Sequence, residues 1–356
     1  MAMGFGVVGA GMISGLHGAA LRDSEKADLV AVCDVAEARA RKLADQFAPG
    51  AAVYTKLDEM LADPRVEVVD VVTPNHLHTD AVLAAFAAGK HVLCEKPPAM
   101  SLVETDRMIA AARRAGLKFG IFVQCRMREP IRRIKQALDE GRFGRLLHAD
   151  AVMKWYRSTD YYRSDPWRSD RRSGAGVTIQ HAFHYIDLLR YLMGPARDVQ
   201  ARMSNLAHPE LQIEDTLDAL IHFQNDVVGT VTASTALWPG LDVRIEVYGD
   251  KGAAVMKGAV LSLWQFQEER PEDEAVRRAG DAAQATAASD PTALPSGEHQ
   301  VVIDDCVDAV AEDRQLAIPC EAVRPTLEIA LAMYKSDRLG KTPVHLPLDD
   351  DQGVWE

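Results

Sequence analysis

The sequence predicts an α/β protein, with an N-terminal doubly wound parallel sheet followed by an α+β domain that has an open, mostly antiparallel sheet. Three observations support this fold class. Residues 1–123 alternate short apolar runs with helical patterns, as βαβ units do. A glycine-rich turn joins the first run to the first helix. After residue 126 the runs alternate in polarity and are separated by turn residues, which is typical of antiparallel strands.

The glycine turn follows an apolar run at 5–8, expected to be a buried strand, and precedes a helical pattern at 12–21. In this context Gly9 permits a tight turn and Gly11 lets a pyrophosphate approach the backbone at the helix N-terminus. The third position of the G-x-G-x-x-G/A pattern is Ser14, which is small but a departure. A flavodoxin-like turn without a dinucleotide is the alternative. The residues expected to contact a dinucleotide here are Gly9, Gly11, Met12 and Ile13.

An acidic residue, Asp34, directly follows the second expected strand at 29–33. A carboxylate at this place accepts hydrogen bonds from ribose hydroxyls and repels a 2′-phosphate. Val35 and Ala36 offer no cation to such a phosphate, although Arg39 on the next helix could approach it. We therefore expect NAD to be preferred over NADP as the cofactor.

The rest of the first 123 residues continues the alternation of strands and helices. Its apolar runs show little polar alternation, as in strands that are covered on both faces. Strands are expected at 52–54, 68–72, 91–94 and 118–123, and helices at 36–47, 57–63, 77–89 and 102–115.

Beyond residue 126, a helix is expected at 130–140, and two short polar stretches, Asn225-Asp226 and Asp250-Lys251-Gly252, are expected hairpin turns. The alternating runs lie at 146–156, 197–206, 215–224, 227–236, 243–248 and 259–267. Residues 268–298 are expected to form a mobile loop, followed by helices at 300–312 and 323–339. The expected domains are 1–123 for the cofactor, 124–322 for substrate and oligomer contacts, and 323–356 as a C-terminal helix and tail.

The composition is that of an ordinary globular protein, with 47% hydrophobic and 26% charged residues in a chain of 356. The net charge of −12 argues against a nucleic-acid partner, because phosphate backbones attract basic surfaces. The five cysteines show neither a CxxC pair nor metal-ligand spacing, so we expect no metal site and reduced thiols in the cytoplasm. We find no signal-peptide pattern and no long apolar stretch, so no membrane association is expected.

Two of the expected strand ends carry polar side chains, and ligands bind beyond such ends in an open parallel sheet. The first is Thr-Pro-Asn-His-Leu-His at 73–78, where the proline stiffens the exit of the chain. The alternative reading is ordinary helix capping with surface histidines. The residues expected near the cofactor are Thr73, Pro74, Asn75 and His78.

The second polar strand end is Glu95-Lys96-Pro97-Pro98, after the run at 91–94. Beside a positively charged nicotinamide ring, the ammonium of Lys96 is expected to lose its proton more readily, because like charges disfavour the protonated form. Lys96 could then orient a substrate hydroxyl and exchange its proton while hydride leaves the same carbon. The alternative is a surface Glu–Lys pair.

A third polar group follows Gly174-Ala175-Gly176 in the second domain. Gln180, His184 and Asp187 are spaced by four and three residues, which places them on one side of a helix. Histidine is suited to take a proton near neutral pH, although a lone histidine on an apolar helix is more often a core residue. The glycine-rich entry favours a functional His184, and Asp187 is expected to be structural.

Taken together, these motifs resemble those of the Gfo/Idh/MocA oxidoreductase family over nearly the whole chain, and they fall in family order. The resemblance implies a Rossmann domain with a nicotinamide cofactor, a second domain whose sheet forms oligomer contacts, and action on sugars, polyols or related carbonyls. It also implies that Lys96 is the catalytic lysine and His184 the catalytic histidine. Glu95, Lys96 and Gln124 are further expected cofactor contacts.

One position departs from the family pattern. Many members carry an aspartate four residues before the histidine, where this chain has Gln180. A glutamine can hydrogen-bond a hydroxyl but cannot accept its proton, which leaves Lys96 or His184 as the base. Members that act on nucleotide-linked sugars, such as UDP-N-acetylglucosaminuronate-type dehydrogenases, are similar to this chain in having an amide there.

The segment 154–172 points to the charge of the substrate. It holds six Lys or Arg against three Asp, a charge of +3 in a chain of net −12. Interleaved Trp and Tyr residues could stack on a sugar or base while arginines hold a phosphate or carboxylate. A loop that contacts a neighbouring subunit is the alternative. The residues expected to bind an anionic sugar are Lys96, Tyr162, Arg163, Trp167, Arg168 and Gln180.

The sequence therefore predicts an NAD-dependent oxidoreductase that transfers hydride between nicotinamide and a hydroxyl or ketone carbon of a uronate or nucleotide sugar. The alternatives are a neutral sugar or inositol dehydrogenase with the same mechanism, an enzyme that keeps its cofactor between two sugars, and a non-catalytic dinucleotide-binding regulator. One face of the second sheet has no obvious covering helices, so a homodimer or homotetramer is expected.

Overall fold

The computed structural model describes residues 2–279 and 296–355. It divides into two compact units: Met1–Gln124 with Pro295–Arg324, and Cys125–Leu294 with Pro325–Glu356. Residues up to 322 were expected in the second domain, but α10 (Gly297–Ala311) belongs to the first unit. It does so because it packs beside α1 (Ser14–Asp23), with Ser24 donating to Asp304 and Lys26 paired with Asp308.

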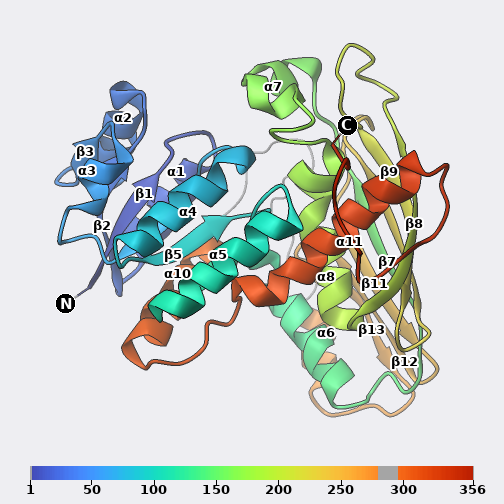
Figure 1. Cartoon of the computed structure of the whole chain (residues 1–356). Helices are drawn as coiled ribbons and strands as arrows, with labels where there is room; N and C mark the ends of the chain where they lie inside the picture. The colour runs from blue at the N-terminus through green and yellow to red at the C-terminus, as the bar shows by residue number, and fades with distance from the viewer. Residues whose placement is uncertain (1, 280–295, 356) are drawn as a thin grey trace. The chain divides into compact units, whose positions relative to one another are not determined.

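The first unit is a six-stranded sheet in the order β3-β2-β1-β4-β5-β6, and every neighbouring pair is parallel (Figure 1). The strands are β1 (Met3–Val8), β2 (Ala27–Cys33), β3 (Ala52–Tyr54), β4 (Val68–Val71), β5 (His91–Glu95) and β6 (Phe119–Phe122). This order confirms the predicted doubly wound sheet. It also places a switch point between β1 and β4, beyond whose carboxyl ends dinucleotides bind.

Helices lie on both faces of this sheet. One group is α1, α2 (Glu37–Phe47) and α10, and another is α4 (His78–Ala87) with α5 (Leu102–Ala115); α3 spans Leu57–Leu61 and η1 spans Asn75–Leu77. The ends of α5 follow from its sequence. Ser101 accepts the backbone N–H of Glu104, and Gly116 ends the helix with a φ of 66°.

The second unit is built on an eight-stranded sheet in the order β13-β12-β11-β7-β10-β9-β8-β14. The strands are β7 (Leu146–Lys154), β8 (Ala196–Ser204), β9 (Thr216–Phe223), β10 (Val228–Ser234), β11 (Arg244–Gly249), β12 (Gly252–Lys257), β13 (Val260–Phe266) and β14 (Val344–His345). Only the β7–β10 pair is parallel among these described strands, so the sheet is mostly antiparallel as predicted. The hairpin at Asn225-Asp226 is confirmed, whereas β12 and β14 were not expected.

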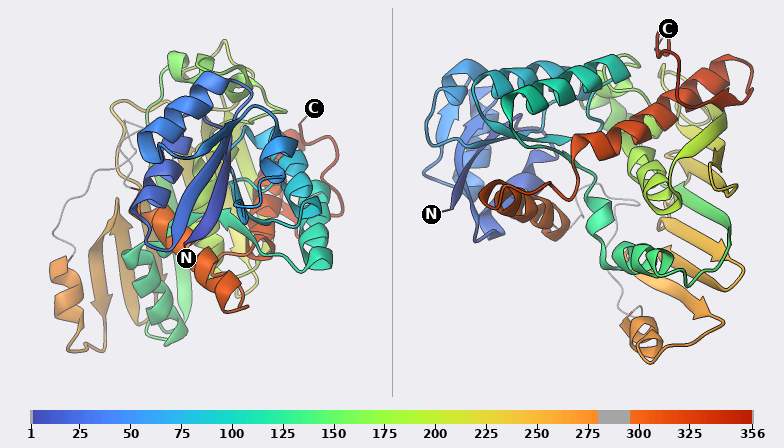
Figure 2. Two further views of the ribbon diagram at one scale, coloured as in Figure 1. Left: turned by 90° about the vertical axis from the view of Figure 1, so that its left-hand side faces the viewer. Right: turned by 60° about the horizontal axis from the view of Figure 1, so that its bottom comes forward.

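The helical segments of this unit are α6 (Glu129–Asp139), α7 (Thr159–Arg163), η3 (Pro166–Ser169), η4 (Thr178–Ala182), α8 (Phe183–Met193) and α9 (Asp273–Ala279), together with most of η2 (Gln124–Met127) and α11 (Cys320–Arg338), whose first residues belong to the first unit. Helices α6 and α8 lie against one face of the sheet (Figure 2), where alternate strand residues such as Ile245 and Val247 are buried. On the opposite face, Glu246 and Tyr248 are half-buried. Helix α9 occupies part of the expected mobile loop, and residues 280–295 of that loop lie outside the described residues.

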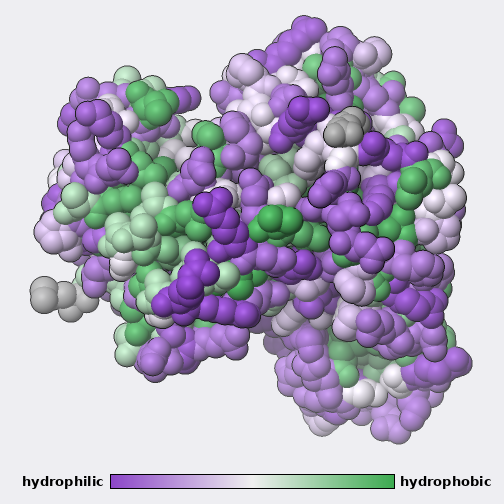
Figure 3. Space-filling view, viewed as in Figure 1, coloured by the Kyte–Doolittle hydropathy of each residue, from purple (hydrophilic) through white to green (hydrophobic). Residues whose placement is uncertain are grey.

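The surface drawn in Figure 3 is a mosaic in which hydrophilic residues surround scattered hydrophobic ones. Within the described residues, no helix combines the length and apolar character needed to cross a membrane. All five cysteines are buried, and none of them forms a disulfide.

Candidate active site

The glycine turn at the end of β1 has the geometry of a phosphate-binding turn. Gly9 has a φ of +97°, and an added Cβ would lie 2.7 Å from the carbonyl oxygen of Val72, so only glycine fits without strain. A Cβ on Gly11, in contrast, would meet no described atom within 4 Å. The first turn of α1 presents backbone N–H groups that have no intrahelical acceptor. Met12 is exposed and Ile13 half-buried beside this opening, which therefore suits a pyrophosphate.

Asp34 directly follows β2 and lies beside the same turn. Its Oδ2 accepts the backbone N–H of Ala10 at 2.8 Å, and its Oδ1 accepts that of Ala36 at 2.8 Å. Nη2 of Arg39 lies 3.0 Å from Oδ1. The carboxylate is thus fixed against the glycine turn, and a guanidinium lies next to it.

Two further strand ends carry polar atoms without partners. Oγ1 of Thr73 after β4 and Oε1 of Gln124 after β6 are buried and have no hydrogen-bond partner among the described residues. Such atoms are costly unless a ligand or water supplies a partner. Pro74 and Asn75, which begins η1, lie at the same strand end as Thr73. Together with the open space at Gly11, these atoms fit a bound dinucleotide.

Glu95 is placed differently from the predicted contact with the cofactor. Its side chain is buried and turns inward, where Oε1 lies 3.1 Å from Nε2 of His17 and Oε2 accepts the backbone N–H of Lys96 at 3.0 Å. Burial by itself would raise the pKa of Glu95, but His17 and Lys96 lower it to about 2. Lys96 is half-buried and is joined to Pro97 by a cis peptide bond.

His78, also expected to contact the cofactor, is fully buried at the start of α4. Its Nδ1 lies 2.8 Å from the carbonyl oxygen of Pro97, and its Nε2 lies 3.0 Å from that of Thr73. Burial lowers the pKa of His78. A neutral ring carries one N–H, and the shorter distance favours a bond from Nδ1 to Pro97 while Nε2 only contacts Thr73. The ring thus lies between two loops of the site, a position that the sequence pattern did not reveal.

In the second unit, Gln180 lies in a π-helical turn rather than in a regular α-helix. Its amide nitrogen donates to the carbonyl oxygen of Arg168 at 2.7 Å and to that of Ala175, and these bonds hold the glycine-rich entry. His184 follows on α8 and is half-buried. π-Helical turns are frequent at functional sites. This one changes the helical phase between Gln180 and His184, so the predicted common face is interrupted.

Asp187 is structural, as predicted. It is fully buried and accepts hydrogen bonds from Nε of Arg126 at 2.7 Å and from Nη2 of the same residue at 2.6 Å. The hydroxyl of Thr326 donates to it at 2.7 Å. This bidentate ion pair anchors α8 within the second unit.

The aromatic and basic segment divides into buried and exposed parts. Tyr162 is 0% exposed and shares a hydrogen bond of 2.6 Å with the hydroxyl of Thr235, so it belongs to the core and the predicted substrate contact is wrong. Arg168 is 8% exposed and donates to the hydroxyl of Tyr161 at 2.9 Å. Arg163 is 62% exposed, with Glu210 at 3.8 Å. Trp167 is half-buried, and its ring lies 4.7 Å from the guanidinium of Arg168.

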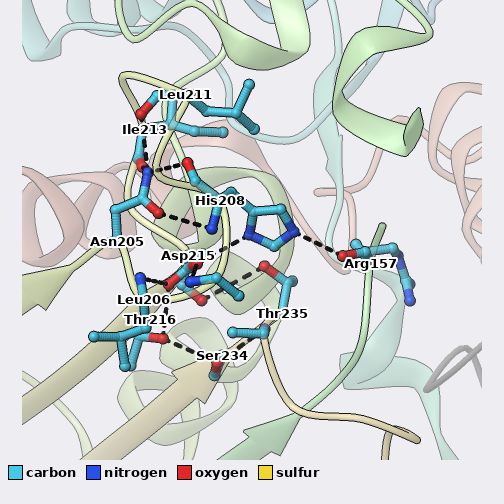
Figure 4. A network of polar contacts seen from close by, with 12 residues as sticks. Arg157, Asn205, Leu206, His208, Leu211, Ile213, Asp215, Thr216, Ser234 and Thr235 are labelled. Atoms are coloured by element: carbon cyan, nitrogen blue, oxygen red, sulfur yellow. Dashed lines mark hydrogen bonds and ion pairs between the residues drawn. The ribbon is translucent and has the colours of Figure 1, made fainter. Parts of the chain in front are cut away.

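A polar network that the motifs did not reveal holds this segment (Figure 4). His208 faces Oδ2 of Asp215 at 2.9 Å and the carbonyl oxygen of Arg157 at 2.9 Å. Because a carboxylate and a carbonyl only accept, both bonds require the imidazolium. The hydrogen bond with Asp215 raises the pKa of His208. Asn205 donates to three carbonyls of the same loop, those of His208, Leu211 and Ile213.

His181 was also missed by the sequence analysis. It is buried, and its ring centroid lies 6.1 Å from that of Trp155 and 5.7 Å from that of Tyr161. The only local signal was its place next to Gln180, which does not distinguish a core ring from a binding one.

Two domain descriptions match the chain: the NAD-binding Rossmann-fold domain of the Gfo/Idh/MocA oxidoreductase family over residues 3–123, and the family's C-terminal domain over residues 131–255. The chain is 30% identical over 254 residues to myo-inositol 2-dehydrogenase of Thermotoga maritima, covering 70% of this chain and 74% of that protein. It is 34% identical over 205 residues to 1,5-anhydro-D-fructose reductase of Ensifer adhaerens, covering 56% and 60%. The structure of the WlbA dehydrogenase of Bordetella pertussis with NADH and UDP-GlcNAcA matches with a TM-score of 0.86 at 27% identity, covering 98% of this chain and 100% of that chain. The chain therefore belongs to the Gfo/Idh/MocA family of NAD-binding oxidoreductases.

Proposed function

We propose that the protein is a dehydrogenase that transfers hydride between NAD and a hydroxyl or ketone carbon of an anionic sugar, either a uronate or a nucleotide sugar. The observation that carries this proposal is a pair of buried guanidinium groups among aromatic rings. Arg157 is 3% exposed, with its guanidinium 5.0 Å from the ring of Trp155, and Arg168 lies 4.9 Å from the ring of Tyr161. Burial lowers the pKa of Arg157, and the groups that oppose this are tyrosines. Asp165 lies 3.7 Å from Nε of Arg168, and the planar donor fork of each guanidinium suits a further oxyanion, such as a phosphate or carboxylate.

The relatives agree in class and differ in substrate. The WlbA structure contains UDP-GlcNAcA, which is a nucleotide sugar, whereas the T. maritima relative is named for myo-inositol, which is neutral. The arginines of this chain favour the charged substrate.

We assign the proton transfer to Lys96 and His184. NAD, when bound, accepts the hydride from the substrate carbon. The proton of the hydroxyl on that carbon passes to Lys96 or to His184, and the same group returns it in the reverse direction. Gln180 binds substrate without exchanging a proton, because an amide cannot accept one.

The residues that hold NAD in this proposal surround the switch point of the first sheet. The glycine turn and the start of α1 bind the pyrophosphate, and Asp34 accepts the ribose hydroxyls. Other polar atoms at the ends of β4 and β6 complete the site. The cofactor residues are Gly9, Gly11, Met12, Ile13, Asp34, Thr73, Pro74, Asn75, Lys96 and Gln124.

The test is a panel of uronates, nucleotide sugars, neutral hexoses and inositols, assayed for NADH formation. Turnover of uronates or nucleotide sugars is the expected result. Vigorous turnover of inositol or glucose, with none on the charged sugars, would refute the anionic substrate.

Arginine variants test how the charge is recognised. Arg168→Ala should lower kcat/KM for the charged substrate by about 30-fold or more, because it removes a buried charged partner worth about 2 kcal/mol or more. Arg163→Ala should cost less than about fivefold, because its guanidinium is exposed. The matched control is Arg145→Ala, an exposed arginine of the same unit. NAD affinity should be unchanged in all three.

We also propose a cytoplasmic homodimer or homotetramer. The absence of disulfides among the five buried cysteines, all within the described residues, supports a reducing compartment. Exposed Leu220 and Leu263, which lie in register with Glu246 on the face of the second sheet away from α6 and α8, support a subunit interface there.

A further inference from the structure

A cluster of buried ionisable side chains from α1, β4 and β5 lies within the first unit. His17 of α1 is fully buried between two carboxylates. Its Nδ1 lies 2.8 Å from Oδ2 of Asp70 on β4, and its Nε2 lies 3.1 Å from Oε1 of Glu95 on β5. Both carboxylates are also buried. Neither His17 nor Asp70 belongs to the motifs that define the cofactor or substrate residues.

The chemistry of this cluster favours a charged histidine. Carboxylates only accept hydrogen bonds, so a ring bonded to both must carry protons on both nitrogens. Burial alone would lower the pKa of His17, but Asp70 and Glu95 together raise it to about 10. The ring packs edge-on against Phe122, with centroids 4.5 Å apart. His299 of α10 packs beside both rings, with its centroid 5.0 Å from that of His17 and 5.6 Å from that of Phe122, and its Nε2 lies 3.9 Å from Oε1 of Glu95.

Glu95 connects this cluster to the backbone of Lys96. One carboxylate oxygen is held by His17, and the other accepts the backbone N–H of Lys96 at 3.0 Å. The chain leaves the sheet at Lys96. The backbone of Lys96 is thus held by the Glu95 side chain, which is held in turn by His17 of α1, the partner of Asp70 on β4. A charged acceptor makes this a strong hydrogen bond.

A second histidine holds the same segment from the other side of Lys96. His78 contacts the carbonyl oxygen of Pro97 at 2.8 Å through Nδ1 and that of Thr73 at 3.0 Å through Nε2. The residue before Lys96 and the residue after it are therefore each held by a fully buried imidazole.

We propose that His17 and His78 are positioning residues for Lys96, His17 through the carboxylate of Glu95 and His78 through the carbonyl of Pro97. This inference rests on the proposed function for the catalytic role of Lys96, but the hold on its backbone does not. A positioned acid–base group loses rate when its placement loosens, even if substrate and cofactor still bind.

The first experiment measures the hold on the backbone without any turnover. Pro97 and Pro98 have no N–H, so the backbone amides of residues 95–98 that exchange are those of Glu95 and Lys96, which NMR follows one by one. His17→Gln and Glu95→Gln should speed exchange of these amides by about tenfold or more relative to amides of β1. The matched control is His91→Gln, at the opposite end of β5, where Nδ1 accepts the N–H of Lys118.

The second experiment separates positioning from general stability. At a temperature where each variant is folded, His17→Gln and His78→Gln should lower kcat about tenfold or more, with KM and NAD affinity within about threefold of wild type. The control His91→Gln should leave kcat unchanged. If His17→Gln does not fold, both measurements are made on Glu95→Gln, which preserves the shape of the side chain.

The outcomes distinguish the two proposals. Unchanged exchange at 95–98 in both His17→Gln and Glu95→Gln would overturn the positioning inference, even in an active enzyme. Faster exchange in these two variants, combined with a wild-type protein that turns over no sugar, would support the positioning inference and refute the catalytic role of Lys96. One equivalent of a divalent metal in the purified protein, lost in His17→Gln, would overturn the ion-pair account of the cluster.

Discussion

The two glycines of the first turn offer a matched pair of alanine substitutions with opposite expected effects. At Gly9 an alanine would adopt a φ of +97°, which costs about 1–3 kcal/mol. Its Cβ would also lie 2.7 Å from the carbonyl oxygen of Val72, and relieving such an overlap costs about 1–3 kcal/mol more. We therefore expect Gly9→Ala to lower the free energy of unfolding by about 2–6 kcal/mol.

At Gly11 the same change should not destabilise the protein. No positive φ is required there, and the added Cβ meets no described atom within 4 Å. Removing a glycine also restricts the unfolded chain, which stabilises by about 0.4–1 kcal/mol. The methyl group would instead occupy the space through which a pyrophosphate approaches. Gly11→Ala should thus raise the Kd for NAD about tenfold or more while leaving the melting temperature equal or higher.

The assays are urea unfolding followed by circular dichroism, and NAD titration by calorimetry. Wild-type affinity for NAD in Gly11→Ala would refute the placement of the pyrophosphate at this turn. Unchanged stability of Gly9→Ala would show that the backbone can relax away from Val72. Loss of stability in both variants would mean that the turn is packed more tightly than these contacts indicate.

Four further predictions follow from the same structure. Lys96→Ala and His184→Ala should each lower kcat by about 10²–10⁴-fold with NAD binding nearly intact, whereas Gln180→Ala should mainly raise KM; an equal loss of kcat in Gln180→Ala and His184→Ala would contradict this division of roles. NAD should exceed NADP in kcat/KM, and Asp34→Ala should narrow the difference because it removes the repelling carboxylate; a wild-type preference for NADP would overturn the assignment. Because the pKa of His208 is raised, the protonated ring stabilises the fold fully below pH 6.5, its ordinary pKa, and this stabilisation is lost as the pH rises through the raised pKa. His208→Gln should therefore flatten the decline in unfolding free energy above pH 6.5. The same decline in wild type and variant would refute the imidazolium. Light scattering at micromolar concentration should show a homo-oligomer, and a monomer would contradict the sheet-face interface.

Local patterns were sufficient for the cofactor half of the fold. The strand ending at Val8, the glycines of the next turn and the acidic residue at the end of the second strand all depend on neighbours within about 30 residues. Backbone conformation at such a turn follows from which residues tolerate it, so Gly9 could be identified from sequence. The order of strands then followed from the right-handed connections of βαβ units.

Only the tertiary structure decided which side chains face a ligand and which face the core. Glu95, His78 and Tyr162 lie within motifs that predicted ligand contact, yet each is buried against partners distant in sequence: His17 for Glu95, Pro97 for His78 and Thr235 for Tyr162. Motif spacing indicates that a residue has a role but does not show in which direction its side chain points.

The sequence also could not determine to which of the two units each C-terminal segment belongs. Helix α10 has an apolar face like any other amphipathic helix, and its unit depends on which partner surface it meets. In the structure it meets α1, and the ion pair of Lys26 with Asp308 joins residues that are 282 positions apart. Burial and charge pairing between such distant residues depend on the folded arrangement, which periodicity in a single sequence does not encode.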